Sequence, residues 1–551
     1  MSAIELVVML LAVSASLQVL ARRINVPHPV LLVLGGLALA LIPGLPRITI
    51  APDTLFLIFV PPLLYWAALT TSFRDFTRQA SPIARYATLV VLLTMAAVAV
   101  VVHALLPEFT WGAAFLLGAI VAPPDPVAAI AVLRPLGAPR EMVMILEGEG
   151  LMNDATALVS YRIALAAVVT GAFSIGHAAA SFVLAATVGV LVGFAVGWVV
   201  AFARRHLIGR YPIVENTISL LTPFFAYLPA EWLKGSGVLA VVTIGLYLGR
   251  RGPRIMAPAT RVQEESLWTV VQFLLESLIF ILIGLELPVV VHSLRAGTMG
   301  QLIRFGAVLT ATVILVRIAY TMIAMVLLRI GARRRGRTAP PWSQGAFVGW
   351  MGIRGGDSLV IALALPVATA AGAPFPARGP IIFLTFVVIL GTLVIQGATA
   401  VPLLHVLKIR EDGAEDAEEA HARRVKTELG LRVLEEATVT RGTARLIADL
   451  RAQYEARLKK WAARDAAPVV PADDGGVAPA SADAEAERTA DAYRALRRTL
   501  IATEREAVIG LRDRDEISDD VLRRLQRELD LESMMLDSIE DDASEPYEED
   551  S

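Results

Sequence analysis

Residues 122–126 read Ala-Pro-Pro-Asp-Pro and stand in the middle of an apolar stretch at about 110–133. Three prolines in five positions cannot continue an α-helix, because proline lacks a backbone N–H and its ring clashes with the preceding turn. We therefore expect two half-helices joined by extended backbone. Asp125 would cap one half, and freed carbonyls beside Pro124 would be available to a cation. A simple proline kink is the alternative.

The composition indicates a membrane protein. Hydrophobic residues make up 56% of the 551 residues and charged residues 19%, and the mean hydropathy is +0.61. Soluble domains carry about 25% charged residues. The lack of cysteine excludes disulfides, thiol catalysis and cysteine-ligated metals. Apolar blocks end near residue 408, so we expect a transmembrane domain over 1–408 and a charged cytoplasmic tail over 409–551.

Thirteen stretches are candidates for membrane spans, since a span needs roughly 20 apolar residues to cross about 30 Å of hydrocarbon. They are about 3–20, 28–43, 52–71, 83–106, 110–133, 142–170, 174–203, 212–229, 235–249, 266–291, 303–328, 343–367 and 380–407. The loops after the odd-numbered stretches hold nineteen Arg and Lys residues, and the loops after the even-numbered stretches hold five. Because cytoplasmic loops are enriched in cations, we expect the N-terminus outside and the tail in the cytoplasm.

The tail is expected to form three charged helical stretches, at about 413–464, 484–513 and 517–541. A segment rich in Pro, Ala, Asp and Gly near 466–486 resembles a flexible linker. The acidic end, 541–551, is expected to be disordered. A solvated extension that aids assembly and a regulatory domain remain alternatives, because no ligand motif decides between them.

A second group of polar residues lies at 146–154, where the sixth stretch reads Leu-Glu-Gly-Glu-Gly-Leu-Met-Asn-Asp. Ionisable groups inside a span are costly and mark a function or a buried pair. At the helical repeat, Glu149 and Asn153 share a face that Asp154 does not. We therefore expect Asp154 to face a cavity and bind a cation or a proton. Glu147 lies toward the cytoplasmic entrance, where it could attract cations.

A second interruption is predicted at 349–357, Gly-Trp-Met-Gly-Ile-Arg-Gly-Gly-Asp, because its glycines weaken a helix. It lies seven stretches after the first interruption, which is the relation expected of inverted repeats. The sequence thus predicts an all-α polytopic fold of about 13 transmembrane helices, in inverted repeats, with two broken helices.

Buried arginines need carboxylate partners. Arg317 is expected to pair with Glu149 or, as second choice, with Glu276. Arg354 could be balanced locally by Asp357, three residues later. These charges are interpreted as structural ion pairs, which leaves the aspartate of the sixth stretch unmatched and able to exchange ions.

Several motifs in residues 1–408 carry a resemblance to a known family. They are Phe59-Val60-Pro61-Pro62-Leu63-Leu64-Tyr65, Asp125-Pro126-Val127-Ala128, Glu149-x-Leu-Met-Asn153-Asp154-Ala155, Ala230-Glu231 with Ser236-Gly237-Val238-Leu239-Ala240, Phe280-Ile281-Leu282-Ile283-Gly284-Leu285, Arg317, and Gly352-Ile353-Arg354-Gly355. Together they resemble the sodium/proton antiporters of the NhaP and NHE type, the first monovalent cation:proton antiporter family.

The resemblance implies a core domain, stretches 4–6 and 11–13, that moves against a dimerisation domain. It implies that Asp154 binds either a cation (Na⁺ or K⁺) or a proton, that Asn153 and Glu149 brace the site, and that exchange is electroneutral. A homodimer in a prokaryotic plasma membrane is the implied assembly. No enzyme activity, cofactor or nucleic-acid partner is implied.

Three positions depart from the family in a way that removes oxygen atoms. Pro124 stands where Thr is usual and Gly150 where Ser is frequent, and the segment Trp66-Ala67-Ala68 stands where some members have a Glu. These changes make K⁺ an alternative to Na⁺ as the transported cation. Asp357 adds an acid where the family is normally apolar.

We expect cation and proton to compete for Asp154, with the occupied, neutral site crossing and the empty anion resisting the movement. A cation channel or uniporter is the nearest alternative. A polytopic membrane enzyme is a more distant one, because the sequence lacks DDxxD-type clusters, HExxH and a Ser/His arrangement.

Overall fold

A computed structural model of the chain describes residues 3–24, 28–42, 52–133, 139–170, 175–207, 211–293, 299–336, 341–369, 373–409, 413–437, 443–464 and 484–544. These residues are almost entirely helical, and the β-structure among them is one isolated bridge between Ala368 and Pro374. The predicted all-α fold class is therefore confirmed.

The chain divides into two compact units. Unit 1 is Met1–His206, Thr217–Gly252 and Ser266–Glu411, and unit 2 is Leu207–Asn216, Pro253–Glu265 and Asp412–Ser551.

Each of the thirteen apolar stretches falls on a helix or on a pair of half-helices. The single helices are α1 (Ala3–Ile24), α2 (His28–Ala40), α3 (Pro52–Thr70), α4 (Phe73–Leu105), α7 (Arg140–Thr170), α8 (Ile175–Leu207), α9 (Pro212–Trp232), α10 (Gly237–Ile255), α11 (Pro258–Ser293), α12 (Met299–Arg334) and α15 (Arg378–Val406). The half-helices are α5 (Trp111–Val121) with α6 (Pro126–Leu133), and α13 (Trp342–Trp350) with α14 (Gly356–Leu363). Both predicted interruptions are present.

Five helices of the described chain contain segments long and apolar enough to cross a membrane. These are Tyr86–Leu105, Ala180–Leu207, Pro258–Val289, Met299–Arg334 and Arg378–Val406. Four shorter apolar helices lie at Val8–Ala21, His28–Ala40, Thr54–Thr70 and Trp111–Val121. The membrane class follows from these segments, whereas thirteen crossings remain a prediction.

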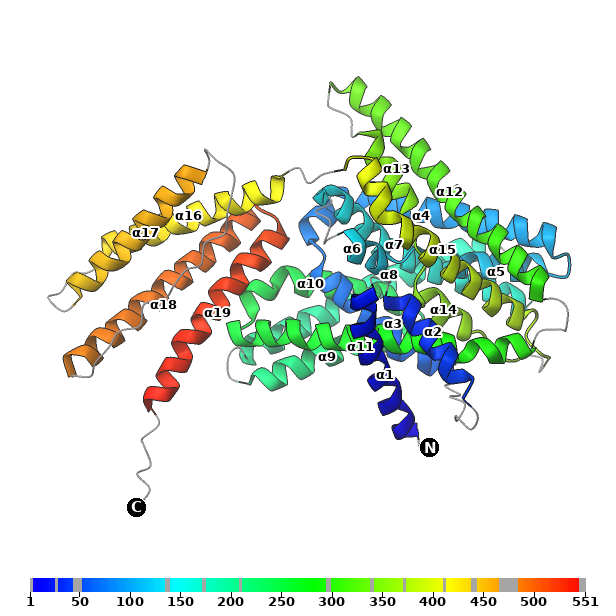
Figure 1. Cartoon of the computed structure of the whole chain (residues 1–551), viewed down its shortest axis with the longest axis horizontal. Coiled ribbons are helices and arrows are strands. Elements are labelled where there is room, and N and C mark those ends of the chain that lie inside the picture. Colours follow the sequence, from blue (N-terminus) through cyan, green and yellow to red (C-terminus); the bar gives the residue numbers. More distant parts are fainter. Residues whose placement is uncertain are drawn as a thin grey trace, which may run out of the picture. The chain divides into compact units, whose positions relative to one another are not determined.

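Helices α4, α5, α7, α12 and α15 pack on one another, together with the half-helices α6, α13 and α14, and form the first bundle of unit 1 (Figure 1). Gly118 on α5 lies against the backbone of Met95 on α4, where a Cβ would overlap the Met95 carbonyl. Glycine therefore lets these two helices approach closely. The first bundle contains the stretches that the family resemblance assigns to the moving core.

The second bundle of unit 1 joins α2, α3, α8, α9, α10 and α11. Glycines again bring the backbones together, and the contacts are Gly193 with Ala240 (α8 and α10), Gly249 with Leu69 (α10 and α3), and Gly36 with Ile281 (α2 and α11). The indole Nε1 of buried Trp268 on α11 donates to the Ser219 hydroxyl on α9 at 2.9 Å. This bundle contains stretches 2, 3 and 7–10, which lie outside the core domain that the family resemblance implies.

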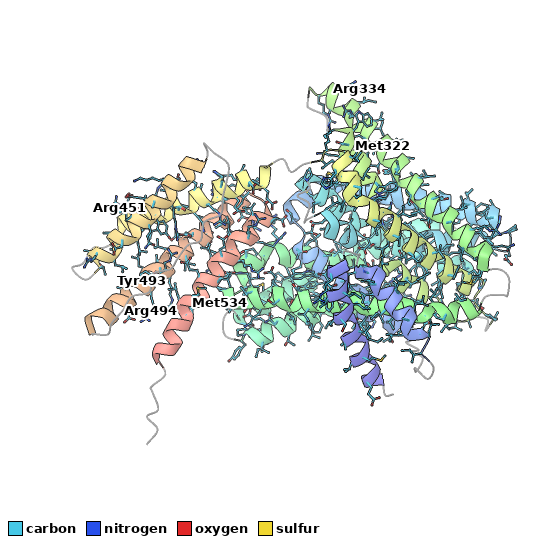
Figure 2. The ribbon with its side chains drawn as sticks, viewed as in Figure 1. Met322, Arg334, Arg451, Tyr493, Arg494 and Met534 are labelled. Carbon is cyan, nitrogen blue, oxygen red and sulfur yellow. The ribbon has the colours of Figure 1, made fainter. Side chains whose placement is uncertain are left out.

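The described part of the tail in unit 2 forms the helices α16 (Ala414–Glu436), α17 (Ala444–Arg464), α18 (Ala484–Asp513) and α19 (Asp519–Ser544). Figure 2 labels Arg451 on α17, Tyr493 and Arg494 on α18, and Met534 on α19. The prediction of one helical stretch over 413–464 was wrong, because α16 ends at Glu436 and a new helix begins at Ala444. The predicted linker at 466–486 lies almost entirely outside the described residues, as do residues 545–551 of the acidic end. Residues 541–544, expected to be disordered, belong to α19.

A buried polar network joins the helices of unit 2. Arg497 on α18 donates to the Tyr454 hydroxyl on α17 at 2.7 Å and to a Glu532 oxygen on α19 at 2.6 Å. The Tyr454 hydroxyl donates to Glu504. Burial, reinforced by the Glu504 charge, raises the pKa of Tyr454. The hydroxyl therefore remains a proton donor at neutral pH.

Unit 2 also includes residues 253–265, which we call the α10–α11 linker. Arg261 in this linker donates through Nε and Nη2 to the two oxygens of Asp530 on α19, at 2.8 and 2.5 Å. Arg505 on α18 donates to the same carboxylate at 2.9 Å. Asp530 is only 2% exposed, and Arg527 adds an outer contact to Glu265 at 2.9 Å. The tail helices are therefore fastened to this linker by a buried, doubly paired carboxylate.

Candidate functional site

The first interruption places Pro123 and Pro124 in buried, non-helical backbone between α5 and α6. Proline supplies no N–H, and Asp125 supplies the next backbone donor. That N–H donates to the Ile353 carbonyl at 2.7 Å. Asp125 is thereby held at the start of α6 by the backbone of the second interruption.

The second interruption, residues 351–355, carries Arg354, whose side chain is 1% exposed. Its Nε donates to the Val121 carbonyl at the end of α5, at 2.8 Å. Its Nη1 donates to the Gly352 carbonyl at 2.5 Å, and its backbone N–H donates to the Thr392 hydroxyl at 3.1 Å. The guanidinium thus satisfies carbonyls that the broken helices leave without partners.

The expected pairing of Arg354 with Asp357 was wrong. A spacing of three residues brings side chains together only within one helix, and α14 begins at Gly356, between the two. Arg354 therefore belongs to the extended connection, while Asp357 occupies the first turn of α14. Asp357 forms no ion pair with any residue that the structure describes.

The two interruptions touch at Gly355 and Asp125. A Cβ on Gly355 would overlap the Asp125 carboxylate. Only glycine, which has no Cβ, leaves room for the carboxylate against the backbone of the second interruption. The crossing therefore depends on glycine at this position.

Helix α7 carries the three residues Glu149, Asn153 and Asp154. Arg317 on α12 donates to both oxygens of Glu149, one of them at 2.7 Å, and both side chains are 1% exposed. This is the partner that the sequence favoured for Arg317. The Asn153 amide donates to Glu149 at 3.2 Å. Its buried Oδ1 accepts no hydrogen bond from the part of the chain that the structure describes.

Asp154 lies among other acids. Its carboxylate interacts electrostatically with those of Asp125 and Asp357, and Glu276 on α11 interacts with the same two. Glu276 accepts a hydrogen bond from Gln272, so it is not the partner of Arg317. Asp154 itself has no hydrogen bond or ion pair with any described residue. Protons or bound cations must offset such a concentration of negative charge.

These acids do not form a compact metal cage. Within the described ranges, no three Asp, Glu or His side chains converge closely enough to hold a metal ion by themselves. A cation at Asp154 would therefore need carbonyl, amide or water oxygens as well. The unsatisfied Asn153 Oδ1 and the carbonyls of the interruptions are of the chemical type that alkali cations accept.

Packing explains one departure from the family pattern. A Cβ on Gly150 would overlap the ring of Pro126, the first residue of α6. A serine there has no room, so its oxygen is absent for a steric reason. Glu147, the residue expected at the entrance, is half-buried on α7 and has contacts of its own.

The sequence did not indicate the partner of Arg162. Its Nη2 donates to Glu231 on α9 at 2.7 Å. The same Glu231 oxygen accepts the N–H of Gly237 at 2.9 Å. Arginine inside an apolar stretch signals that a partner exists, but the spacing of 69 residues gives no clue to which one.

Comparison with known proteins identifies this arrangement. The family model for the sodium/hydrogen exchanger, transmembrane, matches residues 8–406. The chain belongs to the sodium/hydrogen exchanger family. Family membership makes this exchanger a membrane cation/proton antiporter and not an enzyme, and it confirms the resemblance noted from the sequence.

Relatives span most of this exchanger. An uncharacterized Na⁺/H⁺ exchanger of Mycobacterium tuberculosis is 35% identical over 526 residues, which cover 94% of this chain and 93% of the relative. A sodium, potassium, lithium and rubidium/H⁺ antiporter of Bacillus pumilus is 32% identical over 440 residues, which cover 78% of this chain and 65% of the relative.

A solved structure shares the fold of this exchanger. The sodium proton antiporter MjNhaP1 of Methanocaldococcus jannaschii matches 74% of this chain and 98% of its own, with a TM-score of 0.55 and 20% identity. At that identity the match concerns the fold alone.

Proposed function

We propose that this exchanger trades one monovalent cation for one proton, and that the two ions compete for Asp154 during alternating access. The observation that carries the proposal is the matching of charges around Asp154. Arg317 forms an ion pair with Glu149, and Arg354 donates hydrogen bonds to backbone carbonyls. Neither arginine therefore neutralises Asp154. A carboxylate without a fixed counter-charge is suited to bind a cation or a proton in turn.

Na⁺ is the proposed cation, with K⁺ as the specific alternative. Na⁺ is proposed because the chain belongs to the sodium/hydrogen exchanger family. Pro124 and Gly150 supply no side-chain oxygen to a bound cation. This lack favours K⁺, because a larger ion tolerates a less complete coordination shell. The printed name of the Bacillus pumilus relative includes potassium.

The proposed setting is a prokaryotic cell membrane, in which the chain forms a homodimer. The positive charge of the loops after odd-numbered stretches supports an external N-terminus and a cytoplasmic tail. The relatives named above come from prokaryotes, which supports a location in the cell membrane.

Kinetics in proteoliposomes test the competition. Transport is followed with a trapped pH dye while Na⁺, K⁺ or Li⁺ is titrated at a series of pH values. Competition predicts that acidification raises the apparent KM for the cation at constant maximal rate, and that the rise approaches about tenfold per pH unit once the empty site is mostly protonated. An imposed membrane potential should leave the rate unchanged. A fall in maximal rate at constant KM, or a voltage-dependent rate, contradicts one-for-one competition.

A further inference from the structure

The ion pair between Arg162 and Glu231 joins the two bundles of unit 1. Arg162 belongs to α7, the helix of the first bundle that carries Asp154. Glu231 is near the end of α9, in the second bundle, and the same oxygen receives the first N–H of α10 at Gly237. One carboxylate oxygen therefore binds a guanidinium from one bundle and a helix N-terminus from the other.

The pair has a defined position along these helices. Arg162 lies eight residues beyond Asp154, which corresponds to about 12 Å along α7. Helix α10 begins at Gly237, beside the pair, and its other end, at Ile255, belongs to the α10–α11 linker. In the proposed topology the connection between α9 and α10 lies on the outer face of the membrane, so the pair lies toward that face.

A charge at this position needs a reason. An arginine in an apolar helix costs free energy unless it is paired or serves a function. A side chain that only reached toward water would not need an acceptor on the other bundle, yet Arg162 donates to Glu231 at 2.7 Å. The two side chains remain 39% and 27% exposed, so the contact is not sealed inside the protein.

We propose that Arg162 and Glu231 form a latch that closes the Asp154 site on the outer face and must open before Asp154 can exchange ions with that face. The proposal rests on alternating access in the proposed function. A contact present in one conformation and broken in the other shifts their populations by its own free energy. The latch thus favours the conformation in which Asp154 faces the cytoplasm.

Kinetics measured from each face of oriented proteoliposomes provide the first test. Arg162→Met and Glu231→Gln remove the ion pair, while the glutamine retains an acceptor for Gly237. Each should raise the cation KM on the cytoplasmic face and lower it on the outer face, by about threefold to tenfold. Arg162→Lys should remain close to wild type, and Arg162→Glu combined with Glu231→Arg should recover at least part of the shift. Equal KM changes on both faces, or no change, overturn the latch.

Cross-linking gives a second test that does not depend on KM. The chain has no cysteine, so Arg162→Cys with Glu231→Cys can be joined uniquely by a short bifunctional thiol reagent. Joining should stop exchange, and each single-cysteine variant treated in the same way should continue. The matched control is Asn216→Cys with Gln263→Cys, because the Asn216 amide donates to the Gln263 side chain at 3.0 Å and both residues belong to unit 2. This control pair should retain exchange when joined, and a joined Arg162–Glu231 position that still exchanges normally contradicts the latch.

The two hypotheses fail in different ways. If Asp154→Asn retained exchange, the proposed function would be wrong whatever the latch variants did. If Asp154→Asn lost exchange while the joined pair still transported, only the latch would be wrong.

Discussion

The guanidinium Nε of Arg354 lies 2.8 Å from the carbonyl oxygen of Val121 and donates a hydrogen bond to it. Val121 is the last residue of the half-helix α5, whose C-terminal carbonyls carry partial negative charge. In return, the N–H of Asp125 donates to Ile353 in the other interruption. Each broken helix therefore supplies the partner that the other one lacks, and the two interruptions hold each other in place.

Replacing Arg354 should destabilise the exchanger. Arg354→Met leaves the buried carbonyls of Val121 and Gly352 without a donor, which should cost about 3 kcal/mol of unfolding free energy. Arg354→Lys should lose less, because it keeps a charge and can reach one carbonyl. The measurement is thermal unfolding of detergent-purified protein. An Arg354→Met variant that melts with the wild type contradicts this role.

Gly150 tests the steric account of the missing serine. Gly150→Ser places a Cβ against the Pro126 ring, so α6 and α7 must separate, at a cost of about 1–3 kcal/mol. Gly176 on α8 is the matched control, since a Cβ there meets no atom within 4 Å. We expect a lower melting temperature and slower exchange for Gly150→Ser and wild-type behaviour for Gly176→Ser. Equal behaviour of the two variants would remove the steric explanation.

Asp530 tests the attachment of the tail helices to the α10–α11 linker. Asp530→Ala leaves Arg261 and Arg505 without their shared buried partner, which should cost about 3–5 kcal/mol within unit 2. Asp537→Ala removes only an exposed pair with Arg498 and should cost less than about 1 kcal/mol. Hydrogen exchange of the full chain should speed up at 253–265 in Asp530→Ala alone. Unchanged protection there would show that the carboxylate does not hold the linker.

Glu419 gives unit 2 a pH dependence. Burial opposes ionisation of Glu419, but hydrogen bonds from Arg423 and Arg524 outweigh it and hold the pKa of its carboxyl below the ordinary 4.5. A lowered pKa stabilises the folded state above the ordinary value, and this stabilisation is lost as the pH falls through the lowered pKa.

Hydrogen exchange in residues 413–437 of the full chain follows this effect. Protection should be constant from pH 7 to about 5 and weaken in more acidic buffer. Glu419→Gln should be less protected at neutral pH and less sensitive to acid. Glu428→Gln is the control, because Glu428 is exposed and lies 3.9 Å from Arg424. The assignment fails if Glu419→Gln and Glu428→Gln give the same profile.

The sequence predicted the parts of the site that depend on local backbone chemistry. Prolines around Asp125 and glycines around Arg354 break helices wherever the chain goes, so both interruptions could be placed. The choice of Glu149 for Arg317 followed from the need of a buried arginine for a carboxylate partner. Contacts that depend on how the interruptions cross could not be predicted, and Arg354 was therefore assigned to Asp357 and not to backbone carbonyls.

Contacts between residues that lie far apart in the sequence were also not predicted. Nothing in the local pattern relates Arg162 to Glu231 or Asp530 to Arg261, because these pairs are formed by packing of separate helices. The tail showed a similar limit, since charged helical composition continues through 413–464 although the helix ends at Glu436.

Exchange by Asp154→Asn vesicles tests the central claim most directly. Purified wild type, Asp154→Asn and Asp154→Glu are reconstituted with a trapped pH dye, and dye dequenching is followed after addition of Na⁺ or K⁺. We predict no cation-dependent signal for Asp154→Asn, which folds and melts like the wild type, and a reduced but measurable signal for Asp154→Glu, which retains a carboxylate. Exchange by Asp154→Asn at the wild-type rate would contradict the assignment of Asp154 as the group that carries both ions.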